Sequence, residues 1–224
     1  MKTMRWIGLS VAVLVVASSV AVAEETSGDV PKPDADGWYT LFNGKDFEGW
    51  KKSTDNPDCF QVVDGEIVAH GKVCHLFYDG PVANHNFKNF DWKCDVMTKP
   101  HANSGMYFHT HFQEAGFPKT GIECQVNNSH TDPIRTGSLY KLKDIMNDSP
   151  VKDDEWFTQE VIVDGNQITV KENGKVVNEY TWKDGETRKG GFEKNLLDSG
   201  TFALQGHDPG SETHYKNIKV KVLP

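Results

Sequence analysis

From residue 37 to the C-terminus, short stretches of alternating apolar and polar residues are separated by closely spaced turn signals. In residues 90–96, for example, aromatic and aliphatic residues alternate with charged ones. Alternation with a period of two is typical of a β-strand that buries one face. No stretch longer than about ten residues keeps the 3.6-residue period of an amphipathic helix. The pattern therefore predicts strands throughout.

Turn sequences predict how these strands connect. Asp64-Gly65 separates the apolar stretches 60–63 and 66–68, as expected for a two-residue hairpin turn. A three-stranded meander is expected over residues 156–182, and further strands over 90–97, 104–112, 121–127, 201–207 and 214–223. So many strands without a helix predict an all-β fold, a two-sheet antiparallel sandwich of the jelly-roll type. We expect one domain, residues 37–224, with irregular loops at 128–135 and 184–198 that shape a binding site.

The N-terminal segment has the features of a secretory signal peptide. Lys2 and Arg5 precede an apolar stretch over residues 7–16, and Ala21-Val22-Ala23 supplies the small residues of a cleavage site. Such a stretch is too short to span a bilayer, although an uncleaved anchor or a buried helix is the alternative. We expect cleavage after Ala23, export to the periplasm or the medium, no membrane attachment afterwards, and a flexible leader over residues 24–36.

Charge and cysteine content narrow the range of partners and linkages. The formal net charge of −8 repels nucleic acid and anionic lipid, and no basic run offsets it. Four cysteines in an exported chain, Cys59, Cys74, Cys94 and Cys124, permit two disulfides. A zinc site is the second possibility, although no Cys-x-x-Cys pair occurs. Free buried thiols are the third, because Cys94 and Cys124 fall on apolar strand faces.

Three strands carry an unusual polar face. Opposite their apolar faces, the stretches 106–112, 122–127 and 202–207 present groups that donate, accept or titrate, rather than the Lys, Ser and Thr of a solvated sheet. If the three strands lie in one sheet, these side chains converge on one surface. They are Tyr107, His109, His111, Glu123, Gln125, Gln205 and His207. An ordinary solvated face is the alternative reading of each residue taken singly.

The motifs for common chemistries are missing or incomplete. The chain has no Gly-x-Ser-x-Gly elbow, P-loop or dinucleotide fingerprint. Glu123 is the only carboxylate in its strand, so glycoside hydrolysis by paired carboxylates requires a loop residue such as Asp132 or Asp208. No cofactor is certain, but a divalent metal could bind to the candidate ligands His109, His111, Glu123 and His207. Aromatic residues such as Tyr140 would suit sugar rings, which makes a small carbohydrate the expected partner.

Several motifs carry a family resemblance in sequence order. They are Trp38-Tyr39-Thr40-Leu41-Phe42-Asn43-Gly44-Lys45-Asp46, Asn103-Ser104-Gly105-Met106-Tyr107-Phe108-His109, Gly121-Ile122-Glu123-Cys124-Gln125-Val126 and Ala203-Leu204-Gln205-Gly206-His207-Asp208-Pro209-Gly210-Ser211. Together they resemble the 3-keto-disaccharide hydrolase family from residue 37 to the C-terminus. One departure is Cys124, which stands where the family usually has a branched residue.

The resemblance implies a concanavalin A-like sandwich that acts on glycosides already oxidised at C3. A C3 ketone acidifies the C2 proton, so a base can expel the C1 substituent by elimination, and water can then add. In this hypothesis Glu123 or His207 is the base and His109 the acid or a metal ligand, while Asn103, Tyr107, Gln125, Tyr140, Gln205 and Asp208 bind substrate. The alternatives are a non-catalytic lectin-like carbohydrate-binding module, an adhesion domain and an ordinary glycosidase.

Overall fold

The computed structural model describes residues 30–224 of the chain. The expected signal peptide, residues 1–23, lies outside the described residues, and so do residues 24–29 of the expected leader. Apart from two 3-10 turns, η1 (Pro57–Cys59) and η2 (Val82–His85), the regular structure of residues 30–224 is entirely β. Within this range no helix is long and apolar enough to cross a membrane.

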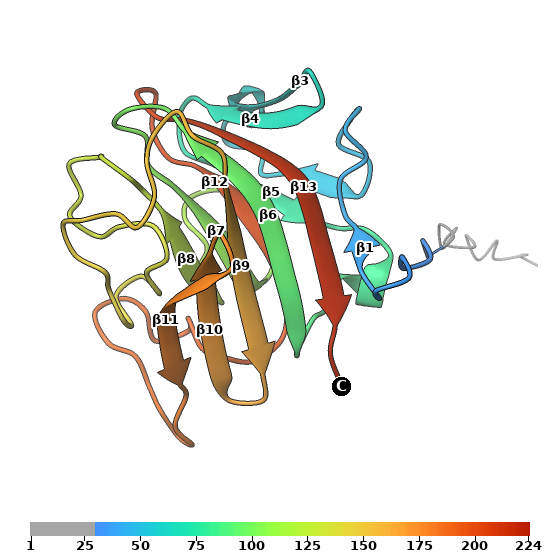
Figure 1. Cartoon of the computed structure of the whole chain (residues 1–224), viewed down its shortest axis with the longest axis vertical. Coiled ribbons are helices and arrows are strands. Elements are labelled where there is room, and N and C mark those ends of the chain that lie inside the picture. The colour runs from blue at the N-terminus through green and yellow to red at the C-terminus, as the bar shows by residue number, and fades with distance from the viewer. Residues whose placement is uncertain (1–29) are drawn as a thin grey trace, which may run out of the picture.

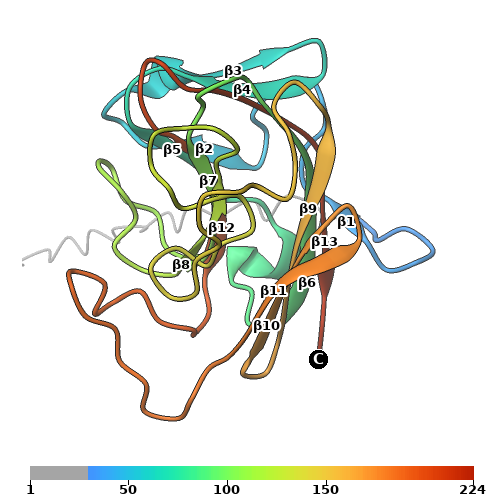
Figure 2. The ribbon, with the colours of Figure 1, turned by 60° about the vertical axis from the view of Figure 1, so that its left-hand side comes forward.

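The strands form two antiparallel sheets that pack face to face (Figure 1, Figure 2). The larger sheet has the order β11-β10-β9-β6-β13-β4-β3, with β1 also paired to β13. The smaller sheet has the order β2-β5-β12-β7-β8. The larger sheet comprises β1 (Tyr39–Thr40), β3 (Phe60–Val63), β4 (Glu66–His70), β6 (Phe90–Thr98), β9 (Phe157–Asp164), β10 (Gln167–Glu172), β11 (Lys175–Thr181) and β13 (Glu212–Val222). The smaller sheet comprises β2 (Trp50–Lys52), β5 (Cys74–Tyr78), β7 (Ser104–Thr110), β8 (Ile122–Val126) and β12 (Thr201–Gly206). The predicted all-β, two-sheet sandwich is confirmed.

The core lies between the sheets and is built from the apolar faces that the alternation predicts. On β6, Phe90, Trp92, Cys94 and Val96 are fully buried while the residues between them are partly exposed. Phe202 of β12 stacks on Trp92 with ring centroids 4.3 Å apart and on Phe87 at 4.4 Å. Because aromatic rings bury the largest apolar areas, this stack fixes the smaller sheet against β6.

The predicted hairpins form at their turn signals. Asp64 and Gly65 both have positive φ, 51° and 82°, as a type I′ turn between β3 and β4 requires. Asn173 and Gly174 repeat this arrangement between β10 and β11, with φ of 52° and 76°. These short connections keep consecutive strands adjacent, so β9, β10 and β11 form the expected meander.

Strand β7 departs from the predicted alternation. We expected one strand over residues 104–112, but β7 ends at Thr110 and contains a β-bulge. Tyr107 pairs with Ala203 and Thr110 with Thr201, so β7 uses one residue more than β12 between the two pairs. The extra residue is accommodated at His109, where the backbone has a φ of 55°. The expectation that His109 shares the face of Tyr107 is therefore wrong, because a bulge ends the period of two.

All four cysteines are free and buried in the sandwich. Of the three possibilities that the sequence left open, the structure shows free thiols. No cysteine belongs to a group of three or more potential metal ligands among residues 30–224. Burial raises the pKa of Cys59 to about 12. The thiols therefore remain protonated and shielded from reagents at neutral pH.

We expect the native protein to be unreactive toward a thiol reagent such as Ellman's reagent, since Cys59, Cys74, Cys94 and Cys124 are buried. In denaturant without any reductant, all four should react. The measurement is the thiol count before and after unfolding. A count of two or fewer after unfolding would indicate a disulfide and contradict the structure.

Candidate functional site

The outer face of the smaller sheet carries a cavity of about 350 Å³. Strands β7, β8 and β12 supply its floor. Its walls come from three irregular segments, represented by Phe117 in loop 111–121, Asp132 and Tyr140 in loop 127–156, and Arg188 in loop 182–200. The loops that we expected to shape a binding site, 128–135 and 184–198, do contribute to it.

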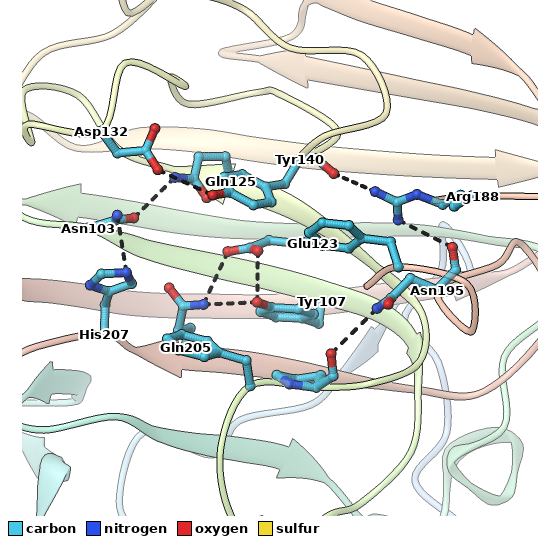
Figure 3. Close-up of a pocket in the computed structure, with 13 residues that line it drawn as sticks. Asn103, Tyr107, Glu123, Gln125, Asp132, Tyr140, Arg188, Asn195, Gln205 and His207 are labelled. Carbon is cyan, nitrogen blue, oxygen red and sulfur yellow. Dashed lines mark hydrogen bonds between the residues drawn. The ribbon is translucent and has the colours of Figure 1, made fainter. Parts of the chain in front are cut away.

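Strand register brings the predicted polar side chains together on this floor. β7 lies between β12 and β8, and Tyr107 is paired directly with Glu123. The cavity is lined by Tyr107, Glu123, Gln125, Gln205 and His207, together with Asn103, which directly precedes β7 (Figure 3). The sequence pattern alone could not show that these three strands are neighbours. In the structure β12, β7 and β8 are adjacent, as the prediction required.

The carboxyl group of Glu123 is held at the centre of the floor by two donors (Figure 3). The Tyr107 hydroxyl donates to Oε2 at 2.7 Å, and Gln205 Nε2 donates to Oε1 at 3.1 Å. Gln205 Nε2 also lies 2.9 Å from the Tyr107 hydroxyl, which closes a triangle. Burial raises the pKa of Glu123 to about 7 and outweighs the two hydrogen bonds, which lower it. At neutral pH this carboxyl group can therefore give or take a proton.

Gly105 makes room for this carboxyl group. Gly105 is paired with Gln125 across β7 and β8. A Cβ atom at position 105 would lie 2.3 Å from Glu123 Oε1 and 3.0 Å from its carboxyl carbon. Any side chain at position 105 would therefore displace the Glu123 carboxyl group from its two donors.

His207 presents one ring nitrogen to the cavity and is oriented by Asp208. His207 Nδ1 lies 2.8 Å from Asp208 Oδ2, so Nδ1–H donates to the carboxylate and Nε2 keeps its lone pair. Asp208 also accepts from Ser211 Oγ at 2.6 Å and from the Gly210 amide at 2.8 Å. Burial works to raise the pKa of Asp208, but the hydrogen bonds from Ser211, His207 and Gly210 outweigh it and lower the pKa. Asp208, expected to bind substrate, instead lies behind His207 and orients its ring.

Two amides connect the groups on the cavity floor. Gln125 Nε2 donates to Asn103 Oδ1 at 3.1 Å. Asn103 Nδ2 in turn points at His207 Nε2, 3.4 Å away (Figure 3). The buried oxygens Gln125 Oε1 and Gln205 Oε1 accept no hydrogen bond from residues 30–224. Both side chains line the cavity, but these two oxygens are themselves buried.

The far wall combines an arginine with aromatic rings. Arg188 donates to the backbone oxygens of Tyr140 at 2.7 Å and Asn195 at 3.2 Å, and its guanidinium lies 4.8 Å from the Phe192 ring centroid. The Tyr140 hydroxyl donates to Asp132 Oδ2 at 3.3 Å. Burial raises the pKa of Tyr140 to about 12, so this hydroxyl keeps its proton.

Of the residues that reach the site from loops, the sequence pointed to Asp132 and Tyr140 but not to the others. Phe117, Pro118, Arg188, Phe192 and Asn195 line the cavity, and His130 lies beside it. No periodic pattern places a loop residue on a face. The available signal was the position of these loops between strands that carry polar faces.

Two predicted site residues lie elsewhere. The ring of His109 is buried at the end of the sandwich, where Nε2–H donates to the Lys88 carbonyl at 2.9 Å and Nδ1 accepts from the Asp198 amide at 3.1 Å. Burial lowers its pKa to about 4, so the ring is neutral and structural. His111 has an exposed ring, with Nδ1 3.3 Å from Thr120 Oγ1. Neither histidine lines the cavity, because the bulge in β7 redirects both side chains.

The candidate metal ligands therefore do not converge as expected. A different set comes together among residues 30–224, in which ligand atoms of His130, His207 and Asp208 lie within 4.8 Å of one another. Two imidazoles and one carboxylate match the donor set of some catalytic zinc sites. Two of these atoms already bond to each other, since His207 Nδ1–H donates to Asp208. A metal bound through His207 Nδ1 would have to replace that proton.

We expect Gly105→Ala to lower activity by at least 100-fold, on the scale of losing one acid–base group, while the protein remains folded. The added methyl group displaces the Glu123 carboxyl group, whose Oε1 lies 2.3 Å from the Cβ position. The two measurements are kcat and the midpoint of thermal unfolding. They are made for Gly105→Ala, for Glu123→Gln and for the double variant Gly105→Ala/Glu123→Gln. The account predicts that Gly105→Ala has little further effect once Glu123 is replaced. Additive losses would contradict it.

Comparison with known proteins places the chain in a family. Residues 37–221 match the family described as "3-keto-alpha-glucoside-1,2-lyase-like domain". The chain is 26% identical to a 3-keto-disaccharide hydrolase of Bacteroides thetaiotaomicron, over 92% of this chain and 85% of that protein. Two crystal structures of proteins from Parabacteroides distasonis, each described as a "putative glycosyl hydrolase", have similar folds. The first has a TM-score of 0.69 and 25% identity over 85% of this chain and 95% of that one. The second has a TM-score of 0.63 and 24% identity over 83% of this chain and 99% of that one.

Because the family match spans the whole sandwich and its cavity, this chain belongs to the family of 3-keto-alpha-glucoside-1,2-lyase-like domains.

Proposed function

We propose that this protein is an enzyme that cleaves glycosides bearing a ketone at C3 of the sugar, by elimination followed by hydration. One observation carries the proposal. A protonatable carboxyl group, Glu123, and an imidazole oriented by a carboxylate, His207, face the same cavity. The family match and the 3-keto-disaccharide hydrolase of Bacteroides thetaiotaomicron support this choice of substrate.

The chemistry of the substrate explains why one acid and one base are sufficient. A ketone at C3 acidifies the proton on C2, because the resulting carbanion is stabilised as an enolate. Loss of this proton expels the C1 substituent and leaves a C1=C2 double bond. No oxocarbenium ion forms, so the enzyme does not need two carboxylates flanking the C1–O bond.

In the first half-reaction His207 is the base and Glu123 is the acid. His207 Nε2 accepts the C2 proton, and Asp208, 2.8 Å from Nδ1, stabilises the imidazolium that forms. Glu123, whose pKa of about 7 keeps much of it protonated at neutral pH, donates its proton to the departing C1 oxygen. The C1–O bond breaks, and its electron pair leaves with that oxygen.

The second half-reaction restores both groups. The Glu123 carboxylate accepts a proton from a water molecule whose oxygen adds to C1. The imidazolium of His207 returns a proton to C2. The sum is hydrolysis, with one water consumed and each side chain back in its starting protonation state.

The remaining polar groups are suited to orienting the sugar. Asn103 Nδ2 lies beside His207 Nε2 and can donate to the oxygen that becomes negative at C3. A small shift of the Gln125 and Gln205 side chains, which line the cavity, would let their unpartnered oxygens accept from sugar hydroxyl groups. The aromatic side chains that line the cavity, among them Phe117 and Tyr140, can contact the apolar face of a sugar ring.

The direct test is turnover of a chromogenic 3-keto-glucoside beside its unoxidised parent, with and without a chelator. We expect cleavage of the keto form alone, because only a C3 ketone acidifies the C2 proton. We expect no effect of the chelator, since His207 Nδ1 is bonded to Asp208. Loss of activity with the chelator would make His130, His207 and Asp208 metal ligands. Cleavage of both substrates would indicate an ordinary glycosidase, and sugar binding without cleavage a lectin-like module.

We expect kcat to fall as the pH rises through about 7, because the acid Glu123 is active only when protonated and burial raises its pKa to about 7. Glu123→Gln should lower kcat by roughly 100-fold or more and remove this alkaline decline. The measurement is the pH profile of kcat for both proteins. Glu155→Gln, a change on an exposed loop, is the control and should keep the wild-type profile. An unchanged alkaline decline in Glu123→Gln would contradict the role of Glu123.

A further inference from the structure

A second histidine, His75 of β5, lies on the face that carries the site. It is paired directly with Gln205 of β12, so both side chains project to the same side of the smaller sheet. The His75 ring packs edge-on against Tyr107, with centroids 5.5 Å apart. His75 therefore lies beside the cavity floor, on the strand next to β12.

The His75 ring is fully buried, yet neither of its nitrogens has a hydrogen-bond partner among residues 30–224. The other fully enclosed histidine, His109, bonds through both nitrogens. Burying a polar group without a partner costs about 1–3 kcal/mol. Burial lowers the pKa of His75 to about 3, so the ring is neutral at physiological pH. It therefore offers one donor and one acceptor, and does not serve as a proton carrier in the reaction.

Phe117 contacts both His75 and a residue of the cavity, His207. The Phe117 ring centroid lies 5.8 Å from that of His75 and 5.8 Å from that of His207. Phe117 lines the cavity, and 47% of its surface is exposed, which is high for a phenylalanine. Little packing therefore opposes rotation of this ring away from His75.

The loop around Phe117 can release the ring without unfolding. The amide of Gly116 donates to Asp55 Oδ2 at 3.0 Å, and the amide of Thr54 donates to the Glu114 carbonyl at 2.8 Å. These bonds hold the backbone before Phe117 and do not involve its side chain.

We propose that His75 is a sugar-binding residue that becomes accessible when the Phe117 ring turns aside, and that it bonds hydroxyl groups of a second sugar ring. A hydroxyl group both donates and accepts, which matches a neutral imidazole. The Glu123 carboxyl group lies over β7. β5, which carries His75, is two strands away from β7, and two strand spacings amount to about 10 Å. That separation exceeds one sugar ring and suits a disaccharide. The proposal rests on the proposed function for its substrate class.

The first experiment compares two substrates in His75→Phe, which keeps an aromatic ring and removes both nitrogens. For a 3-keto-disaccharide we expect KM to rise about tenfold, the equivalent of about 1.4 kcal/mol. For a methyl 3-keto-glucoside, which has no second ring, we expect the wild-type KM. His85→Phe, at a partly exposed position in η2, is the control and should change neither value. Equal effects on both substrates, or none on the disaccharide, would overturn the proposal.

A second experiment decides the proposal even if His75→Phe does not fold or the proposed reaction fails. Diethylpyrocarbonate modifies neutral imidazoles, and mass spectrometry locates the modified residue. We expect Phe117→Ala to make His75 reactive and a saturating 3-keto-disaccharide or its unoxidised parent to protect it, whether or not it is cleaved. The methyl glucoside should not protect. Failure to label His75 in Phe117→Ala, or equal labelling with saturating disaccharide, would overturn the proposal. Absence of turnover with protection intact would refute the proposed function alone.

Discussion

The hydrogen-bonded triangle of Tyr107, Glu123 and Gln205 is the arrangement on which the rest of the site depends. It places a carboxyl group on the outer face of a sheet in surroundings dry enough to raise its pKa to about 7. It requires β8, β7 and β12 to be neighbours in this register, because each strand supplies one member. It also requires glycine at position 105, since a Cβ atom there would meet the carboxyl group. The sandwich and its aromatic stack around Phe202 hold these three strands in place.

The second half of the site is built differently. Glu123 lies on regular β-structure, whereas His207 follows the end of β12 and takes its orientation from Asp208. Asp208 is itself held by Ser211 and Gly210 in the turn that leads to β13. An uncharged acid and an oriented base on one face are suited to removing a proton beside a ketone and protonating a leaving oxygen. They are less suited to stabilising an oxocarbenium ion, for which two flanking carboxylates are the usual arrangement.

Alternation allowed much of this site to be predicted from the sequence, and its failures have physical causes. Tyr107, Glu123, Gln125 and Gln205 lie on regular strands, where a period of two fixes the face. The prediction failed at His109, because a bulge with positive φ interrupts the period of two there. The backbone around the bulge is so close to Gly121 and Gly200 that a Cβ atom at either glycine would clash with its carbonyl groups. His75 escaped notice because every residue of β5 is buried, so neither of its faces stands out as polar or exposed. Arg188 and His130 lie on loops, where no period applies.

The account is tested most directly by the fate of the hydrogen on C2 of the sugar. A 3-keto-glycoside deuterated at C2 should be cleaved more slowly than the unlabelled compound, with a primary kinetic isotope effect on kcat/KM. In D₂O the unlabelled substrate should yield a product that carries deuterium at C2. Both results follow if His207 removes that proton and Glu123 assists departure of the C1 substituent. Cleavage without a C2 isotope effect and with the C2 hydrogen retained would contradict the elimination mechanism and return the site to ordinary glycoside hydrolysis.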